Sequence, residues 1–358
     1  MAHKKLFIPG PVDVRPDVLA AMATPMIGHR SKDASVLQRA VSEKLQQVFQ
    51  TREQILLSTS SGSGLMEGAI RSFTQKGVAV FSVGAFGKRW YEMAVQNGKN
   101  ADLFEVPQGQ PTLPEAVEAA LATGKYDTFT ITHNETSSGV MNPAAAIAEV
   151  RRRHPDVLWL MDTVSSMGGT PIPVDELGVD CCITSSQKAL ALPPGLSACS
   201  VTKRAIERAR GVKERGFYFD MVQLYDFIFK KDYQYPSTPS LAHMYALNLQ
   251  LDLMLSVGLE AYWKRHEDNM RLTREWAARH FRLLVDEAYA SRTVTVVHNT
   301  REVNISDLNK ALGERGYQIA NGYGDLKDKT FRIAHMGWRT REELQALFGH
   351  MEEILGLK

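Results

Sequence analysis

A chain of 358 residues is longer than one hydrophobic core normally supports, so we expect a large domain and a smaller one. Hydrophobic residues make up 44% of the chain and charged residues 23%, a balance that is typical of a folded globular protein and excludes extensive disorder. The net charge is only +2, and no apolar run approaches the roughly 20 residues that span a bilayer. Composition therefore argues against nucleic acid or a membrane as partner and favours a small-molecule substrate.

The cysteines indicate the compartment. Cys181, Cys182 and Cys199 are odd in number and two of them are adjacent, which favours neither a disulfide framework nor a paired zinc motif. The N-terminal segment has no long apolar run before its first prolines, so it lacks the pattern of a secretion signal. We therefore expect a cytoplasmic protein in a reducing environment.

The first part of the chain alternates short β-branched runs with amphipathic stretches, which predicts repeated βα units. The predicted strands are residues 55–57, 78–83, 102–106, 126–132, 157–161, 180–184 and 197–201. Leu37, Val41, Leu45 and Val48 have the spacing of one helical face before the first strand, and Pro143 suits the first turn of a helix over 144–150. The fold class is therefore α/β, with a mostly parallel seven-stranded sheet.

After Pro239 the pattern changes to two long helices, 240–257 and 259–285, followed by short strands at 293–297 and 331–334 that alternate with helices. The aromatic-rich segment 211–239 predicts an ordered excursion rather than a flexible linker. We expect an N-terminal arm (1–20), a large domain (21–239) and a small C-terminal α+β domain (240–358).

Ligands of open α/β sheets bind beyond the carboxyl ends of the strands, where this chain places several polar segments. Residues 58–64, Ser-Thr-Ser-Ser-Gly-Ser-Gly, follow the first strand and lead into a helical pattern, so their backbone amides would suit a phosphate; a simple capped turn has the same composition. The segment contains neither G-x-G-x-x-G nor G-x-x-x-x-G-K-[ST], which counts against a nicotinamide-dependent dehydrogenase.

Two further segments follow the next strands along the sheet. Residues 83–89, Val-Gly-Ala-Phe-Gly-Lys-Arg, would let Phe86 stand over a flat ring, although the segment taken alone favours core packing of this aromatic residue. Residues 133–139, His-Asn-Glu-Thr-Ser-Ser-Gly, would surround a polar ligand or cap the next helix. His133 has no second ligand at helical or hairpin spacing, so we expect no metal site.

The sharpest signal is a pair of opposite charges, each at the end of an apolar strand. Asp162 follows residues 157–161, and Lys188 follows residues 180–184. A structural account would join them in a buried salt bridge, but such pairs contribute little stability. Pyridoxal phosphate explains both better, because it needs a lysine amine for its aldehyde, a carboxylate for its ring nitrogen and backbone amides for its phosphate.

At these residues the chain resembles the class V branch of fold type I pyridoxal phosphate enzymes, specifically aminotransferases related to alanine–glyoxylate, serine–glyoxylate and serine–pyruvate aminotransferase. The motifs that carry the resemblance occur in order at residues 9–11, 28–31, 61–64, 133–139, 162–166, 186–190 and 331–337. The resemblance implies ping-pong transfer of an amino group from a small L-amino acid such as alanine or serine to a 2-oxo acid such as glyoxylate or pyruvate. It also implies a homodimer with active sites at the subunit interface.

The resemblance also implies roles for individual residues. Lys188 would hold the cofactor and carry the proton, and Asp162 would keep the ring nitrogen protonated. Phe86, where many relatives have Trp, and Val164 would lie on opposite faces of the ring. The other implied contacts are Ser63, Gly64, Leu65 and Gln187 with the phosphate, Thr136 near the cofactor, Tyr235 and Thr238 with the phosphate of the neighbouring subunit, and Arg332 with the substrate carboxylate.

Several alternatives stay open at this point. Tyr235 and Thr238 would also suit ordinary interface or turn packing, and Arg332 would also suit the surface of an edge strand. A lyase or desulfurase on the same fold would keep Lys188 and Asp162, although a desulfurase needs a loop cysteine and the three cysteines here fall in predicted strands. A non-enzymatic subunit would not need to keep these residues together. The sequence does not select the amino donor, and Arg30 is a candidate for binding a second carboxylate.

Overall fold

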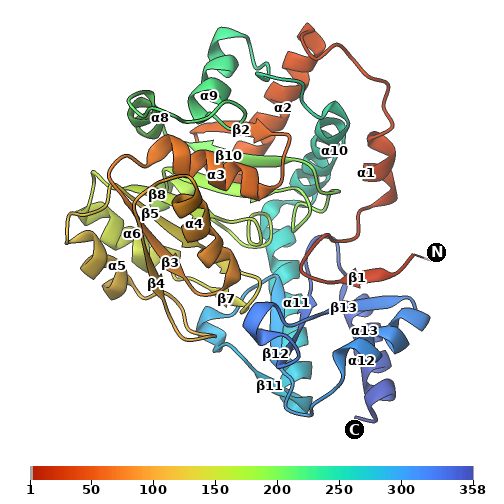
Figure 1. The fold of residues 1–358 in the computed structure, drawn as a ribbon. Coiled ribbons are helices and arrows are strands. Elements are labelled where there is room, and N and C mark those ends of the chain that lie inside the picture. The colour runs from red at the N-terminus through yellow and green to blue at the C-terminus, as the bar shows by residue number, and fades with distance from the viewer. Residues whose placement is uncertain (1–2, 358) are drawn as a thin grey trace.

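Two separate sheets organise the chain in the computed structural model, which describes residues 3–357 (Figure 1). The larger sheet has seven strands in the order β2-β10-β9-β8-β5-β3-β4. Their bounds are β2 (Gln54–Ser58), β3 (Val78–Ser82), β4 (Ala101–Glu105), β5 (Thr128–Thr132), β8 (Leu158–Asp162), β9 (Cys181–Ser185) and β10 (Ser197–Val201). All neighbours are parallel except β10, which runs antiparallel to β2 and β9. The predicted mostly parallel seven-stranded sheet is therefore confirmed.

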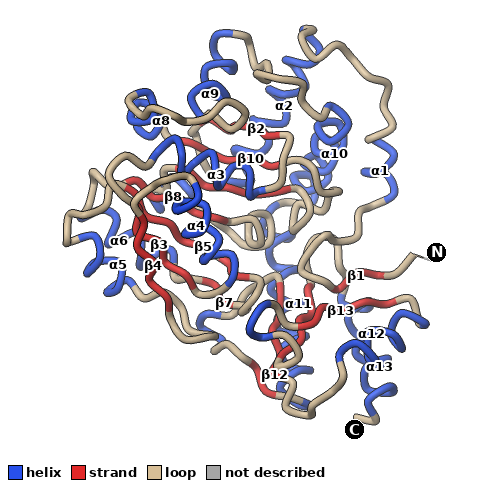
Figure 2. Tube along the Cα trace, viewed as in Figure 1, coloured by secondary structure: helices blue, strands red, loops and turns tan. Residues whose placement is uncertain are grey.

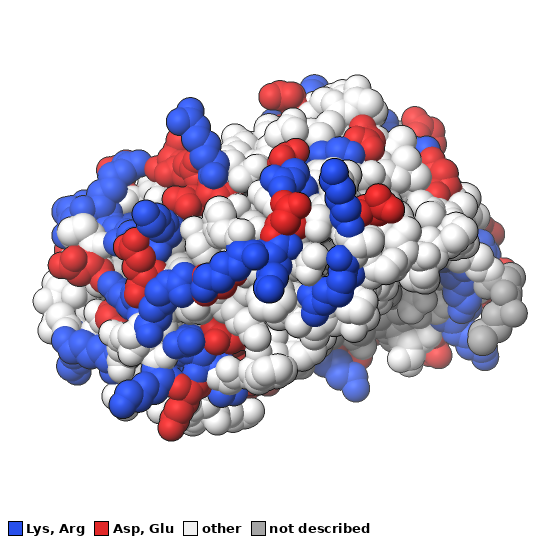
Figure 3. All heavy atoms as spheres, turned by 90° about the horizontal axis from the view of Figure 1, so that it is seen from above, with Lys and Arg blue, Asp and Glu red and all other residues white. Residues whose placement is uncertain are grey.

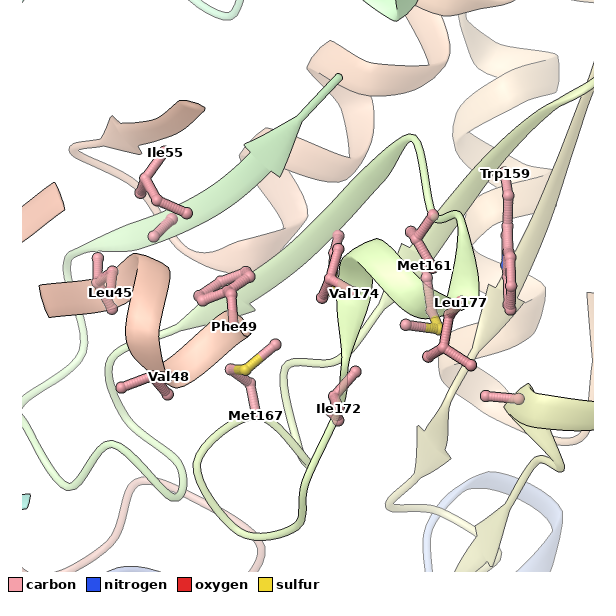
Figure 4. Packing of buried hydrophobic residues seen from close by; sticks show 14 of the residues in the cluster. Leu45, Val48, Phe49, Ile55, Trp159, Met161, Met167, Ile172, Val174 and Leu177 are labelled. Carbon is pink, nitrogen blue, oxygen red and sulfur yellow. The ribbon is translucent and has the colours of Figure 1, made fainter. Parts of the chain in front are cut away.

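Helices cover both faces of this sheet, which explains why its strands are nearly all apolar. In β8, Trp159 and Met161 point into one core while Leu158 and Leu160 point into the other, as a period of two requires. The first core contains side chains of α2 (Lys32–Phe49), α5 (Pro114–Leu121), α6 (Ala144–Arg153), α7 (Val174–Leu177) and α10 (Leu241–Val257), and part of it is seen in Figure 4. The second contains side chains of α3 (Gly62–Phe73), α4 (Ala85–Gln96), α8 (Lys203–Arg210) and α9 (Met221–Lys230).

The second sheet has five strands in the order β1-β13-β14-β12-β11, and Figure 2 shows the two sheets as separate groups of red strands. Their bounds are β1 (Lys5–Phe7), β11 (Arg282–Leu283), β12 (Val294–His298), β13 (Tyr317–Asn321) and β14 (Thr330–Ala334). Side chains of α11 (Leu259–His280), α12 (Ile305–Glu314) and α13 (Arg341–Leu355) form a core with this sheet. The strands expected at 293–297 and 331–334 correspond to β12 and β14, whereas β1, β11 and β13 were not predicted.

The N-terminal segment and α10 refine the expected domain division. The segment is joined to the second sheet, because β1 pairs in parallel with β13. The short helix α1 (Pro16–Ala21) follows it, and Val18 of that helix lies in the first core of the large sheet. Helix α10 packs against α2 in the same core. We therefore propose a large domain that extends through α10 and a small domain that begins at α11 and takes β1 as an added strand.

A short β-hairpin, whose strands have two residues each, follows β5. Strands β6 (Asn134–Glu135) and β7 (Val140–Met141) pair antiparallel, and residues 136–139 form the turn between them. Gly139 has φ +78° in this turn, and a Cβ atom there would lie 2.8 Å from Cγ2 of Val296 on β12. The hairpin therefore fits closely against the second sheet only because residue 139 is glycine.

Charged residues of both signs are interspersed on the face seen in Figure 3, so no extended patch of one sign forms there. Within residues 3–357, none of the helices combines the length and the apolar character that crossing a bilayer requires. The same range contains no group of three or more His, Cys, Asp or Glu side chains arranged to hold a metal ion.

Candidate active site

The carboxyl ends of the central parallel strands open into a cleft with two compartments. The first has a volume of about 270 Å³ and the second about 410 Å³. Both are lined by Gly10, Phe86, Thr136 and Lys188, so the two compartments are adjacent at these residues. Of the residues predicted from sequence, Ser63, Phe86, Thr136, Asp162, Val164, Gln187 and Lys188 line the first compartment, and Arg332 lines the second.

The first turn of α3 forms one end of the first compartment. Ser61 is the N-cap residue, but its side chain makes no capping hydrogen bond, so backbone amides at the start of this helix remain available. Residue 62 must be small, because a Cβ atom at Gly62 would lie 2.6 Å from Cγ2 of Val164. Ser61, Gly62 and Ser63 all line the compartment. A helix N-terminus with open amides suits an anion such as a phosphate.

Arg89 adds a cation at the same end, which the sequence analysis did not single out. Its Nη1 donates to the hydroxyl of Ser63 at 3.2 Å, and its Cζ lies 4.7 Å from the centre of the Phe86 ring. Among residues 3–357, no acidic side chain lies within 4.0 Å of the guanidinium. The sequence could have indicated Arg89, because residues three apart share one face of a helix and Arg89 follows Phe86 by three positions.

Asp162 ends β8 and faces the first compartment with 5% of its surface exposed. Its Oδ1 accepts a hydrogen bond from the Val164 amide at 2.8 Å. Burial raises the pKa of this carboxyl to about 6, and the negative charge of Glu135 acts in the same direction. Although both side chains are described, Lys188 and Asp162 form no ion pair within 4.0 Å, so the structural salt bridge considered above is not formed.

Lys188 follows β9 and lies where the two compartments meet. Burial lowers the pKa of its amine to about 8; the positive charge of Arg332 also lowers it, while Asp162 opposes the shift. The Nζ atom donates a hydrogen bond to the carbonyl of Pro9 in the N-terminal segment. An amine with this pKa is partly neutral near pH 8, which suits a nucleophile and proton carrier.

Glu135 is a second residue that the sequence analysis did not single out. This fully buried carboxylate accepts hydrogen bonds from the amides of Phe86 (3.0 Å) and Gly87 (2.9 Å) at the N-terminus of α4. Its other oxygen accepts from the amide (3.1 Å) and hydroxyl (2.7 Å) of Ser137. Glu135 therefore fixes Phe86 beside the compartment without contributing a charge to its lining.

Arg332 lies on β14 between two other strands and is 8% exposed, so it is not a surface arginine of an edge strand. Its Nε donates to the carbonyl of Asn321 at 2.9 Å, and its Nη1 donates to the carbonyl of Thr136 at 3.2 Å. The Tyr323 ring lies 5.5 Å from its Cζ. These contacts hold the planar guanidinium at the second compartment, where it would grip a carboxylate.

Two residues expected at the phosphate, Gly64 and Leu65, do not line the cleft. The amide of Gly64 donates to the carbonyl of Ser61 at 2.9 Å, and a Cβ atom there would lie 2.7 Å from the Phe219 ring. Leu65 is fully buried in the second core of the large sheet. Ser61 and Gly62, one turn earlier, occupy the position next to the compartment.

Tyr235, Thr238 and Arg30 also lie outside the cleft of their own chain. Tyr235 is buried, and its hydroxyl accepts a hydrogen bond from the Thr59 amide at 3.3 Å. Thr238 is exposed. Arg30 donates to the carbonyls of Tyr235 and Pro236, so its guanidinium supports this segment rather than the cleft.

The arrangement of sheet, lysine and helix N-terminus defines the class: it is that of fold type I pyridoxal phosphate enzymes. The family model for class-V aminotransferases matches residues 18–345, and the chain belongs to this family. Class V aminotransferases depend on pyridoxal phosphate, so the predicted family and cofactor are confirmed.

Similar proteins cover nearly the whole chain. An aminotransferase of Methanocaldococcus jannaschii is 39% identical over 360 aligned positions, which cover 98% of this chain and 92% of the relative. The alanine–glyoxylate aminotransferase of Oryctolagus cuniculus is 34% identical over 368 positions, covering 99% and 93%. The solved structure of an alanine–glyoxylate aminotransferase from Nostoc sp. has a TM-score of 0.93 at 30% identity and covers 99% of this chain and 96% of that one. The prediction of a class V aminotransferase is therefore confirmed.

The residues of the first compartment fit this cofactor. The first turn of α3 and Arg89 offer donors to a phosphate at one end, and Asp162 offers a carboxylate that has no cation paired with it. Asn134 also lines the compartment, and its buried Oδ1 has no hydrogen-bond partner among the described residues. The set provides the anion site, the carboxylate and the amine that pyridoxal phosphate requires.

Proposed function

We propose that this enzyme moves the amino group of a small neutral amino acid to a 2-oxo acid by a ping-pong mechanism, with glyoxylate as the favoured acceptor. The observation that carries the proposal is the position of the Lys188 amine at the boundary between two compartments. One compartment fits the cofactor, and the other is lined by the fixed guanidinium of Arg332. A substrate held by its carboxylate on Arg332 therefore occupies the compartment that this amine borders.

Each charged residue has a distinct task in this proposal. When bound, pyridoxal phosphate supplies an aldehyde that bonds to amino groups and a ring that withdraws electrons from the substrate. Asp162 is ionised at neutral pH, because its pKa is about 6, and it would hold the ring nitrogen in its protonated form. Lys188 would take the proton from the substrate α-carbon and hold it at Nζ until it is returned. Phe86 and Val164, which line the first compartment, would hold the ring.

The charges around the second compartment support a neutral donor. Within residues 3–357, Arg332 and Lys188 are the cations that line this compartment, and Arg332 is assigned to the carboxylate common to all amino acids. Among the described residues of one chain, a second carboxylate on the donor would have no cation of its own there, so the lining from this chain favours a neutral donor. Alanine and serine carry no such charge, and the names of two similar proteins, both alanine–glyoxylate aminotransferases, support the same donor class and acceptor.

The predicted contacts with the phosphate also belong to this proposal. Ser63, Gln187 and the first turn of α3 bind it, with the backbone of Gly64 and Leu65 completing the turn and Arg89 adding a positive charge. Tyr235 and Thr238 reach the phosphate of a second copy of the chain. The exposed aromatic side chains Phe217 (78% exposed) and Phe229 (63% exposed) on the same excursion support a homodimer, because large apolar side chains are enriched in interfaces. Three free, buried thiols are compatible with the proposed cytoplasmic location.

The test is a half-reaction without acceptor. The purified enzyme is mixed separately with alanine, serine, aspartate or phosphoserine, and the visible absorbance and the released 2-oxo acid are measured. The proposal expects alanine or serine to convert the cofactor to its pyridoxamine form with one equivalent of 2-oxo acid, and glyoxylate to reverse the change. Lys188→Ala should abolish both, whereas Lys203→Ala, at a position 79% exposed, should change neither. Release of ammonia without pyridoxamine formation would instead identify a lyase.

A further inference from the structure

The N-terminal segment is built into the active site and contacts the amine of Lys188. We propose that Pro9 and Gly10 are positioning residues: the carbonyl of Pro9 holds the Lys188 amine whenever this amine is not bonded to the cofactor, and Gly10 makes the contact possible. The proposal rests on the proposed function, in which the same amine must act as a free base. It extends that function to Pro9, which lies 179 positions before Lys188, and to its neighbour Gly10.

Sterics at Gly10 show how closely the two segments fit. A Cβ atom at residue 10 would lie 2.8 Å from Cδ of Lys188, 2.9 Å from Cε and 3.1 Å from Nζ. The three nearest atoms therefore belong to the same side chain. Gly10 also has φ +115°, a backbone conformation that residues other than glycine rarely adopt. Any other residue at position 10 must displace either the N-terminal segment or the catalytic lysine.

The N-terminal segment is held firmly on both sides of this contact. Before it, β1 pairs with β13, and the fully buried Phe7 belongs to the core of the second sheet. After it, Asp13 accepts a hydrogen bond from the Leu6 amide at 3.0 Å and pairs with the buried guanidinium of Arg339. Arg339 also donates to the Leu6 carbonyl at 3.0 Å. The Pro9 carbonyl is therefore fixed by the small domain, although Lys188 belongs to the large one.

The same sheet carries the residue assigned to the substrate carboxylate. Strand β13 lies between β1 and β14, and its residue Ala320 pairs with Arg332. Arg332 also donates to the carbonyl of Asn321, the last residue of β13. Strand β13 thus connects Arg332, which is assigned to the substrate carboxylate, with the segment of Pro9, whose carbonyl accepts from the Lys188 amine. Any shift of this sheet when a carboxylate binds Arg332 also moves the hydrogen-bond acceptor of Lys188.

The hydrogen bond is compatible with proton transfer by the lysine. A neutral amine donates one N–H to the Pro9 carbonyl and keeps its lone pair for the substrate proton; the resulting ammonium donates through the same bond. The proton lost by the α-carbon becomes an N–H of Lys188 and is later returned, so no further reactant is needed. The carbonyl therefore restricts the rotation of a flexible side chain without consuming its reactive electron pair.

The test compares Gly10→Ala with Gly258→Ala. Gly258 also has a positive φ, +90°, but no atom lies within 4 Å of a Cβ built there, so this control carries the backbone strain without the contact. Single-turnover rates of the holoenzyme are measured with alanine and with alanine deuterated at the α-carbon. We expect Gly10→Ala to lower the limiting rate by about tenfold or more, to raise the isotope effect, and to leave the apparent Kd for alanine within about twofold. The control should match the wild type.

A second measurement does not depend on turnover. Acetylation of Lys188 by acetic anhydride in the cofactor-free protein is followed by mass spectrometry. Loss of the hydrogen bond should make labelling about threefold to tenfold faster in Gly10→Ala, with no change in Gly258→Ala. If the two variants give the same isotope effect and the same labelling rate, the proposal is wrong.

Two further arms keep the test decisive. Should Gly10→Ala fail to fold, Asp13→Asn loosens the anchor without changing the contact itself; faster Lys188 labelling supports the proposal and unchanged labelling overturns it. Failure of the proposed function is recognised separately. In that case wild-type holoenzyme forms no pyridoxamine with any donor, while labelling of the cofactor-free protein still tests the contact between Pro9 and Lys188.

Discussion

Replacing Asp162 with asparagine should stabilise the cofactor-free protein while weakening its grip on the cofactor. Asparagine has nearly the same shape, and its side-chain oxygen can still accept the hydrogen bond from the Val164 amide. What disappears is a buried negative charge. Burial raises the pKa of Asp162 from 3.8 to about 6, a difference of about 2 pH units. At 1.36 kcal/mol per unit, ionisation of this carboxyl costs the folded protein about 3 kcal/mol.

The pH dependence follows from the direction of this shift. In the unfolded chain the carboxyl loses its proton as pH rises through 3.8, whereas in the folded protein it keeps the proton until pH is about 6. The cost is therefore complete above pH 6 and fades as pH falls toward 3.8. Asp162→Asn should be more stable than the wild type by about 3 kcal/mol at pH 7.5 but by only about 1 kcal/mol at pH 4.5.

Urea unfolding of the cofactor-free proteins, followed by tryptophan fluorescence at both pH values, measures these differences. Asp156→Asn is the matched control, because Asp156 is exposed and its charge is solvated. A variant that is no more stable than the wild type at pH 7.5, or equally stabilised at both pH values, would refute the argument from burial. With cofactor added, the wild type should become more stable than Asp162→Asn, because asparagine cannot hold a proton on the ring nitrogen.

Three further predictions concern the lining of the cleft. Arg332→Lys should raise the KM for alanine by about tenfold or more, because lysine cannot bind a carboxylate through two prongs, and should leave cofactor affinity unchanged in a spectroscopic titration. Glu135→Gln should lower the free energy of unfolding by about 2 kcal/mol, because its NH2 group cannot accept the hydrogen bonds that one carboxylate oxygen accepts from Phe86 and Gly87 or the other accepts from Ser137, and should weaken cofactor binding. Gly62→Ala should raise the Kd for pyridoxal phosphate by about tenfold or more, since its Cβ atom must displace Val164; an unchanged Kd would contradict the assigned position.

The large sheet could be predicted from the sequence because its strands are buried on both faces and so form continuous apolar runs. The small sheet could be predicted only in part. Its strand β13 reads Tyr-Gln-Ile-Ala-Asn, which is neither an apolar run nor a clean alternation, and β1 has only three residues. Short strands of this kind are formed by pairing between distant segments, which local pattern does not record.

The same distinction separates the predicted site residues from the missed ones. Lys188 and Asp162 could be predicted to line the cleft because each places a charge at or just after the end of an apolar strand, an arrangement that needs a special cause. Glu135 escaped notice because its partners lie 48 and 49 positions away, and Pro9 because its contact with Lys188 spans 179 positions. Their roles depend on which segments meet in the folded chain.

Burial shifts the pKa values of Asp162 and Lys188 in opposite directions, and the proposed contacts with the cofactor would relieve the cost in both cases. Without it, burial disfavours the charged forms of Asp162 and Lys188, so each group lowers the stability of the protein at neutral pH. In the proposed function a protonated ring nitrogen would give Asp162 the cation that the described residues do not provide, and a bond to the Lys188 amine would remove the need to bury an ammonium. Cofactor binding should therefore stabilise the fold by more than its contacts alone contribute, and it should do so through the two residues to which the proposed function assigns the chemistry.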